Sequence, residues 1–144
     1  MTVSTHLGFK FEGTLSGTNP RYQEIVVADT AFREGDTVNL ESGEVDLGAT
    51  ADTAFVGVVT ATKSGLTAST SVIEVCRNAD AIYSAYDANA RVMGVALDLT
   101  GATGAQTVTT KSNDEFVVVA TSTALERTLV RFNNDVFHDL VAQT

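Results

Sequence analysis

The sequence predicts a mainly β protein: a small antiparallel β-barrel or β-sandwich with an extended N-terminal arm and either a short C-terminal helix or a docked tail. First, apolar and polar residues alternate in several short segments between Tyr22 and Phe132, as in half-buried strands. Second, Ser42-Gly43 lies between two such segments and is short enough to close an antiparallel hairpin. Third, threonine, valine and alanine are abundant while proline occurs once, a composition that suits pleated strands.

The first half of the chain contains a series of predicted strands separated by polar turns. A strand over 22–28 is centred on consecutive β-branched residues. In the hairpin that follows, Val38 and Leu40 alternate with polar neighbours and are expected to pair with Val45 and Leu47. Two more strands are predicted over 54–62 and 72–77.

The second half of the chain begins with a sequence pattern similar to one in the first half. Val92–Leu97 can be aligned with Phe55–Thr60, and each segment carries an interior glycine, Gly94 and Gly57. The match is short, so both an internal duplication and chance similarity stay open. Glycine inside a strand usually marks a bulge, a sharp bend or a close backbone approach, which we expect at both positions. Further strands are predicted at 105–108, 116–119 and 125–132.

After Phe132 the alternation ends. The apolar residues that would share one side of a short helix are Val136, Phe137, Leu140 and Val141. Asn134 or Asp135 would cap that helix at its N-terminus. A docked extended tail is the alternative.

The N-terminal segment has a strong apolar alternation of its own. Leu7, Phe9 and Phe11 fall on one face of an extended segment, and a Gly-, Ser- and Thr-rich stretch over 13–20 follows them. These three residues are therefore predicted to bind a partner as an arm, and the alternative is a first strand packed on its own domain. The resulting division is an N-terminal arm and linker over 1–20 and a single β domain over 21–144.

Charge and cysteine content exclude several classes of partner. The formal net charge of −9 argues against nucleic acid and anionic membranes, because such binding depends on lysine and arginine neutralising phosphates. Cys76 is the only cysteine, so neither an intramolecular disulfide nor a cysteine-based zinc site is expected. No basic, apolar leader and no apolar stretch of about 20 residues occurs, so we expect a soluble protein made in a cytoplasm-like compartment.

The residue types that carry catalysis are few and scattered. His6 and His138 lie at opposite ends of the chain, and a general base needs a fixed partner within hydrogen-bond reach. Arg77 adjoins Cys76, but neighbours in a strand point to opposite faces, so Cys76 is predicted to be a buried structural residue. The acidic residues form no calcium-loop pattern and are interpreted as turn residues, with a weak divalent site on a symmetry axis as the alternative. The sequence therefore predicts no enzyme, no cofactor and no metal site within one chain.

Four segments, in this order, resemble the small capsid cement, or head decoration, proteins of tailed bacteriophages. They are the apolar strand Ile25-Val26-Val27, the Gly-Asp-x-Val-x-Leu phrase Gly35–Leu40, the hairpin Ser42-Gly43 and the Gly57-Val58 strand. The resemblance covers about half of the chain and is looser from Asp80 onward. It implies a protein that binds the outer surface of an icosahedral shell of major capsid protein, as a homotrimer at local three-fold positions. The implied location is the virion surface, after synthesis in the host cytoplasm.

A non-catalytic β-sandwich glycan-binding module on a phage or bacterial surface structure is the alternative function. The absence of tryptophan and the presence of only three tyrosines count against it, because sugar sites commonly use aromatic platforms.

Overall fold

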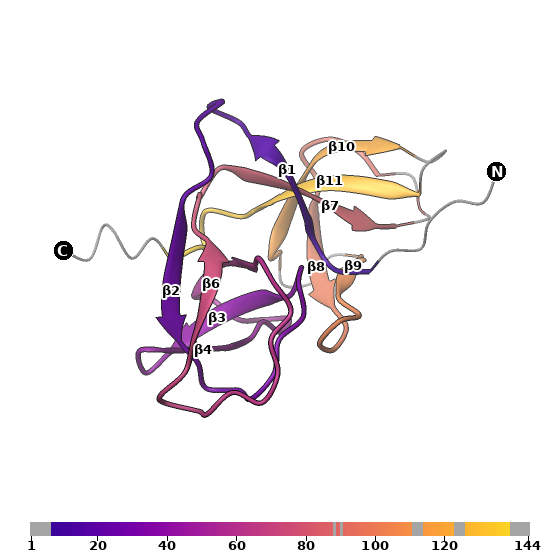
Figure 1. Cartoon of the computed structure of the whole chain (residues 1–144). Helices are drawn as coiled ribbons and strands as arrows, with labels where there is room; N and C mark the ends of the chain where they lie inside the picture. The colour runs from indigo at the N-terminus through magenta and orange to yellow at the C-terminus, as the bar shows by residue number, and fades with distance from the viewer. Residues whose placement is uncertain (1–6, 88, 90, 111–113, 123–125, 139–144) are drawn as a thin grey trace.

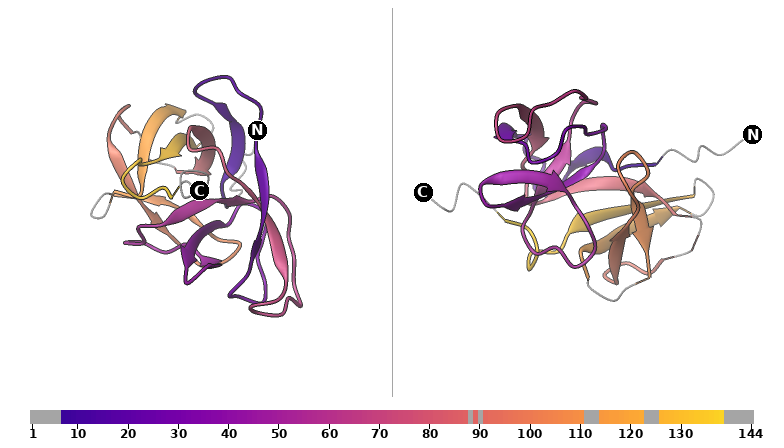
Figure 2. Two further views of the ribbon diagram at one scale, coloured as in Figure 1. Left: turned by 90° about the vertical axis from the view of Figure 1, so that its left-hand side faces the viewer. Right: turned by 90° about the horizontal axis from the view of Figure 1, so that it is seen from below.

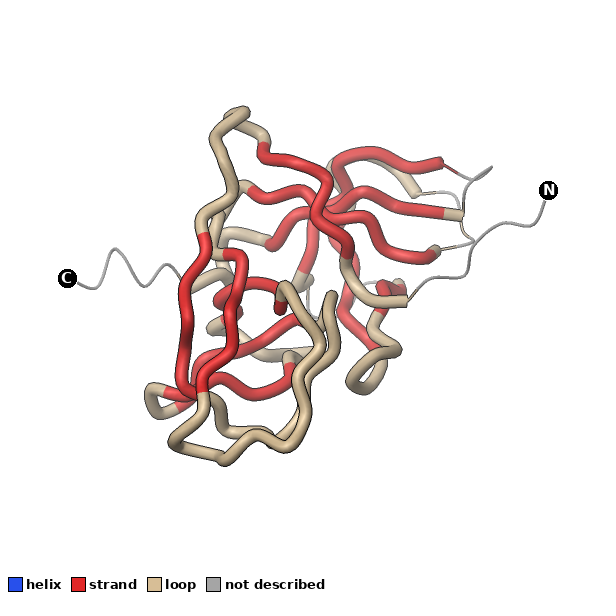
Figure 3. The backbone as a smooth tube through the Cα atoms, in the orientation of Figure 1, coloured by secondary structure: helices blue, strands red, loops and turns tan. Residues whose placement is uncertain are grey.

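The fold is all-β in the residues that the computed structural model describes, namely 7–87, 89, 91–110, 114–122 and 126–138. Two antiparallel sheets pack against each other as a sandwich, and the described residues form neither a helix nor a closed barrel (Figures 1 and 3). The predicted mainly β class is therefore confirmed in its sandwich form.

The six-stranded sheet has the order β1-β7-β11-β10-β8-β9 and draws mainly on the second half of the chain. Its strands are β1 (Lys10–Thr14), β7 (Ala81–Tyr86), β11 (Arg127–Phe132), β10 (Phe116–Ser122), β8 (Ala96–Thr100) and β9 (Thr107–Thr109).

The five-stranded sheet has the order β2-β6-β5-β3-β4 and comes from the first half. Its strands are β2 (Tyr22–Val26), β6 (Val72–Cys76), β5 (Phe55–Val59), β3 (Thr37–Glu41) and β4 (Glu44–Leu47). The sheet curls so strongly that the chain leaving β2 reaches the far edge, where the Ala28 amide donates to the Val45 carbonyl at 2.8 Å. Figure 2 shows this curl from two further directions.

The core consists of two apolar clusters. The larger lies between the sheets and is rich in aromatic rings, with Phe132 contacting Phe55 at 5.3 Å and Phe116 at 5.0 Å between ring centroids. The smaller is almost entirely aliphatic and fills the inside of the curled five-stranded sheet, where Val38, Val45 and Val56 are fully buried. Burial of such side chains contributes roughly 1.5–3 kcal/mol each relative to exposure.

Gly57 allows β5 to serve both clusters. A register shift opposite this residue interrupts the ordinary alternation, so Phe55 and Val58 join the aromatic cluster while Val56 joins the aliphatic one. The Gly57 φ of +141° is one that side-chain-bearing residues rarely adopt. The predicted bulge at Gly57 is confirmed.

The hairpin at Ser42-Gly43 is also confirmed. Val38 pairs with Leu47 and Leu40 with Val45, and the two turn residues have φ values of +53° and +80°. Positive φ at both positions is the geometry of a type I′ turn, whose twist matches that of the flanking strands.

The prediction of a separate N-terminal arm is wrong for residues 8–14. β1 pairs with β7, Phe9 is 2% exposed, and its ring stacks on Phe116 at 4.8 Å. The Phe9 amide also donates to the Gly35 carbonyl at 2.9 Å, which ties the segment to the other sheet. Apolar alternation created a face that the chain buries in its own core, as the alternative prediction held. The boundary at residue 20 falls in the connection between β1 and β2.

Two features of the second half differ from expectation. Gly94 lies in an exposed turn and not inside a strand, because β8 begins only at Ala96. The alignment of 92–97 with 55–60 therefore joins a turn to a strand and does not support a duplication. Sequence reasoning also missed β7, which lies between β1 and β11 in the sheet. Its small residues, including Ala81, Ser84 and Ala85, give little apolar contrast.

The described part of the C-terminal tail is a turn followed by a short segment docked on β5. Residues 134–136 form a turn, and Phe137 makes a parallel bridge with Phe55 at the start of β5. Arg77 holds this segment, since its guanidinium donates to the Val56 carbonyl at 2.6 Å and to the His138 carbonyl at 3.3 Å. The other two residues of the predicted helix face, Leu140 and Val141, lie outside the described residues.

Candidate functional site

The three residues predicted to bind a partner have different environments. Leu7 is 38% exposed, whereas Phe9 is buried and Phe11 packs partly buried against the core, edge-on to Tyr83 at 6.0 Å. Of the three, Leu7 is the most exposed.

A more exposed apolar group lies in the turn Val92–Val95, between β7 and β8, and is called the apolar turn below. Val92 is 70% exposed, Met93 74% and Val95 41%. Single exposed apolar residues are ordinary on a protein surface, but adjacent ones mark interaction sites more often. The sequence pattern missed this site because the same residues resembled a strand.

Backbone hydrogen bonds fix the apolar turn to β10. The Gly94 amide donates to the Val118 carbonyl at 2.9 Å, and the Val118 amide donates to the Val95 carbonyl at 2.9 Å. The Gly94 φ of +87° makes this tight reversal accessible at little cost. The backbone that carries the exposed side chains is therefore held in place before any partner binds, which reduces the backbone entropy lost on association.

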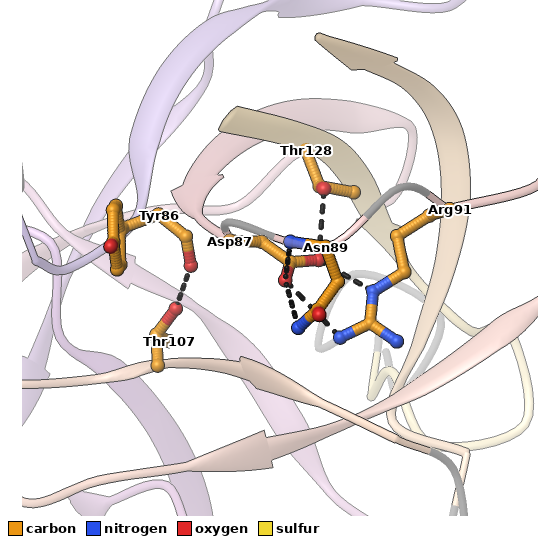
Figure 4. Close-up of polar contacts among 6 residues, drawn as sticks. All are labelled: Tyr86, Asp87, Asn89, Arg91, Thr107 and Thr128. Carbon is orange, nitrogen blue, oxygen red and sulfur yellow. Dashed lines mark hydrogen bonds and ion pairs between the residues drawn. The ribbon is translucent and has the colours of Figure 1, made fainter. Parts of the chain in front are cut away.

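An ion pair fixes the chain just before the apolar turn (Figure 4). Arg91 Nε donates to Asp87 Oδ2 at 2.6 Å, a second guanidinium nitrogen lies 3.2 Å from Oδ1, and the fully buried Thr128 donates its hydroxyl to Oδ2 at 3.0 Å. Burial alone would raise the pKa of Asp87, but hydrogen bonds from Arg91, the Asn89 amide and Thr128 outweigh it and lower that pKa. Ionised Asp87 is thus the anchor of this loop.

Buried polar side chains connect the two sheets. Gln106 Oε1 accepts from the Thr37 amide at 2.7 Å, and its Nε2 donates to the Gly48 carbonyl at 2.8 Å. Asp36 accepts from the Gly104 amide at 2.8 Å and from the Thr103 hydroxyl. Because both Gln106 and Asp36 are fully buried, they orient the connection between β8 and β9 on β3.

Acidic side chains crowd the β3–β4 hairpin. Burial is the main cause that raises the pKa of Asp46, and the nearby negative charges of Asp52, Asp29 and Glu41 raise it further. Burial likewise raises the pKa of Asp52.

Lowering the pH through the folded pKa of Asp46 should increase the free energy of unfolding of the protein. Because the folded pKa of Asp46 exceeds its unfolded value, the folded state binds more protons as pH falls through the folded pKa toward the unfolded one, and stability rises. We expect Asp46→Asn to stabilise the protein at neutral pH by about 0.5 kcal/mol and to reduce this rise. Urea denaturation at several pH values measures both, with Glu34→Gln as an exposed single-charge control. Equal effects of the two substitutions would contradict the local origin.

No catalytic grouping involves the candidate residues in the described part of the chain. Cys76 is buried as predicted, with Sγ 3.7 Å from Asn78 Oδ1. The described hydrogen bonds of His138 use its backbone amide and carbonyl and not its imidazole. His6 lies outside the described residues. Between residues 7 and 138, apart from the gaps given above, no group of three His, Cys, Asp or Glu side chains could hold a metal ion.

No protein-family model, curated protein or solved structure matches the chain. Within the described segments, no helix is long and apolar enough to cross a membrane.

A surface cavity of about 280 Å³ lies beside the connection that follows β1. Its lining residues are Leu15, Ala79, Asp80, Arg131 and Asn134. This lining offers no aromatic platform, so the cavity does not favour the glycan-binding alternative.

Proposed function

We propose that this chain is a capsid cement protein of a tailed bacteriophage, which binds the outer surface of the icosahedral shell and stabilises contacts between major capsid subunits. Under this proposal it has no catalytic role and needs no cofactor. It is made in the host cytoplasm and ends on the virion surface.

The observation that carries the proposal is the apolar turn. Val92 and Met93 are mostly exposed, yet the backbone beneath them is bonded to β10 and the preceding loop is fixed by the Asp87–Arg91 pair. Such a feature costs solubility in a free protein and gains binding free energy when it enters a pocket on a partner. In a protein whose role is attachment to a shell, the exposed apolar turn would contact the partner.

The resemblance to cement proteins adds support because of where its pieces fall. The four matched segments belong to β2 and its exit, to the hairpin of β3 and β4 with its entry, and to β5. All of these belong to the five-stranded sheet, so the resemblance corresponds to one structural unit and not to scattered turns.

The proposed assembly is a homotrimer at local three-fold positions, because closed cyclic symmetry is usual in assemblies of identical chains. A density map of decorated particles should show three copies around each occupied axis. Isolated single copies would refute the trimer without refuting attachment.

The double variant Val92→Ser/Met93→Ser should lose attachment while keeping its fold. We expect unfolding free energy to change by less than about 0.5 kcal/mol, because both side chains are mainly in water. Co-sedimentation with undecorated heads of the encoding phage should weaken by about tenfold or more, since two apolar contacts are lost.

Leu15→Ser, which removes an apolar side chain that is 57% exposed elsewhere, is the matched control and should co-sediment normally. If the original chain ignores phage heads but is retained on a glycan column, the cement proposal fails and the glycan-binding alternative takes its place.

A further inference from the structure

The edge of the five-stranded sheet formed by β2 is open. In Figure 1 this strand lies at the left margin of the molecule, paired on one side with β6. The Val27 amide donates to the Ser71 carbonyl at 3.0 Å, and the Arg77 amide donates to the Arg21 carbonyl at 2.8 Å. Because these two bonds delimit an antiparallel ladder, the odd-numbered residues of β2 direct their amides and carbonyls toward β6.

The even-numbered residues of β2 therefore direct their backbone groups away from the sheet. They are Tyr22, Glu24 and Val26, and the first two are exposed. A row of outward amides and carbonyls with a two-residue repeat is the template onto which an extended peptide adds as a further strand. A parallel bridge between Val27 and Val45, with the Ala28 amide donating to the Val45 carbonyl, covers this edge from Val26 onward. The open stretch of β2 is therefore Tyr22–Glu24.

The side chains along this edge select the charge of such a peptide. Glu24 lies directly opposite Glu74 at a non-hydrogen-bonded position, where cross-strand side chains come closest, and both are exposed. Like charges in this arrangement are destabilising. The 54% exposed Tyr22 and the 41% exposed Val72 flank them on the same face of the sheet.

We infer that the open edge of β2 binds an extended segment of a partner protein that carries an arginine or lysine opposite Glu24. A cation in that place would neutralise the Glu24–Glu74 repulsion, and an arginine fork can also bond a carboxylate with two donors. The inference rests on the proposed function only for the identity of the partner, which is then the major capsid protein. The apolar turn and β2 would be two separate contacts.

A second copy of this chain does not fit the same edge. Antiparallel pairing centred on β2 would place the two Glu24 side chains against each other, beside two copies of Glu74. Each chain also carries a formal net charge of −9, so the repulsion is not local to one pair.

A peptide probe tests the edge directly. The probe is acetyl-Lys-Thr-Val-Arg-Val-Thr-Lys-amide, whose central arginine and two threonines share one face of a strand. With the ¹⁵N-labelled full chain, millimolar peptide should slow hydrogen exchange of the Tyr22 and Glu24 amides. Glu24→Gln/Glu74→Gln should raise the dissociation constant about tenfold, as loss of a charge-assisted contact does.

Three controls separate backbone pairing from general charge attraction. One control peptide has glutamate in place of arginine, and another is methylated at the backbone nitrogen of the arginine. Both should bind about tenfold more weakly or not at all. Glu41→Gln/Glu44→Gln removes another directly opposed glutamate pair, at the β3–β4 turn, and should leave peptide affinity unchanged.

Unchanged exchange of the β2 amides, equal binding of the N-methylated peptide, or equal effects of the two glutamine pairs would each overturn the inference. If heads bind the Glu24→Gln/Glu74→Gln variant normally and the peptide leaves β2 unprotected, the edge inference fails while the cement proposal stands. If the peptide protects the β2 amides but the chain does not bind phage heads, the edge inference stands while the cement proposal fails.

Discussion

Replacing Gly57 with alanine should destabilise the protein by about 4 kcal/mol or more, or prevent folding. A Cβ at this position would lie 1.9 Å from the Cys76 carbonyl oxygen and 2.7 Å from Val75 Cγ1. Neither obstacle can move aside easily, because the first is the backbone of the neighbouring strand and the second belongs to a fully buried, β-branched side chain. β5 and β6 would have to separate at the place where β5 supplies side chains to both clusters.

Gly13→Ala is the matched control for this substitution. Gly13 also lies at a register shift and has a φ of +149°, close to the +141° of Gly57, but no atom lies within 4 Å of its added Cβ. Alanine there should cost only the backbone strain, about 1 kcal/mol. Urea denaturation midpoints measure the difference, and equal losses for both variants would show that strand contact contributes nothing at Gly57.

Alternation of apolar residues predicted most of the five-stranded sheet. Strands such as β3 and β4 have one apolar and one polar face, although Thr37 and Asn39 on the polar face of β3 are buried. Ser42-Gly43 supplies the turn that sets their register. The same rule missed β7, in which small and large side chains follow no two-residue alternation and polarity hardly changes. Period-two patterns report a difference in polarity between faces, so they fail where both faces are apolar or where side chains are small.

The local sequence also fails to distinguish two similar glycine-containing segments. Phe55-Val56-Gly57-Val58 is a strand because β3 and β6 lie on either side of it. Val92-Met93-Gly94-Val95 is a turn because β8 begins only after it. The difference comes from pairing partners distant in the sequence, which no short window contains.

The candidate site was the least predictable part. The apolar turn was read as a strand, and the open edge of β2 depends on which strands end the sheet order. Buried polar groups were hidden for a related reason: Asp36 has the sequence context of a turn residue, yet it is fully buried because the chain near Gly104 covers it. Turn chemistry predicts where an aspartate sits but not what later folds over it.

Phe9→Ala decides whether the N-terminal segment is an arm or a strand, and we expect a loss of about 3–5 kcal/mol in the free energy of unfolding. The Phe9 ring is 2% exposed and stacks on Phe116, which is itself fully buried beside Phe132. Removing the ring leaves a cavity in the cluster between the sheets, and rigid strands on both sides limit its collapse. Chemical denaturation of the free protein measures this loss without any partner.

Leu7→Ala is the matched control in the same segment. Leu7 is 38% exposed, so its truncation should cost only about 1 kcal/mol, well below the loss at Phe9. A stable Phe9→Ala variant that no longer attaches to phage heads would restore the arm, because the ring would then act on a partner and not on its own core. Loss of stability at Phe9 alone would instead show that this segment belongs to the core and would leave the proposed attachment to the apolar turn and the β2 edge.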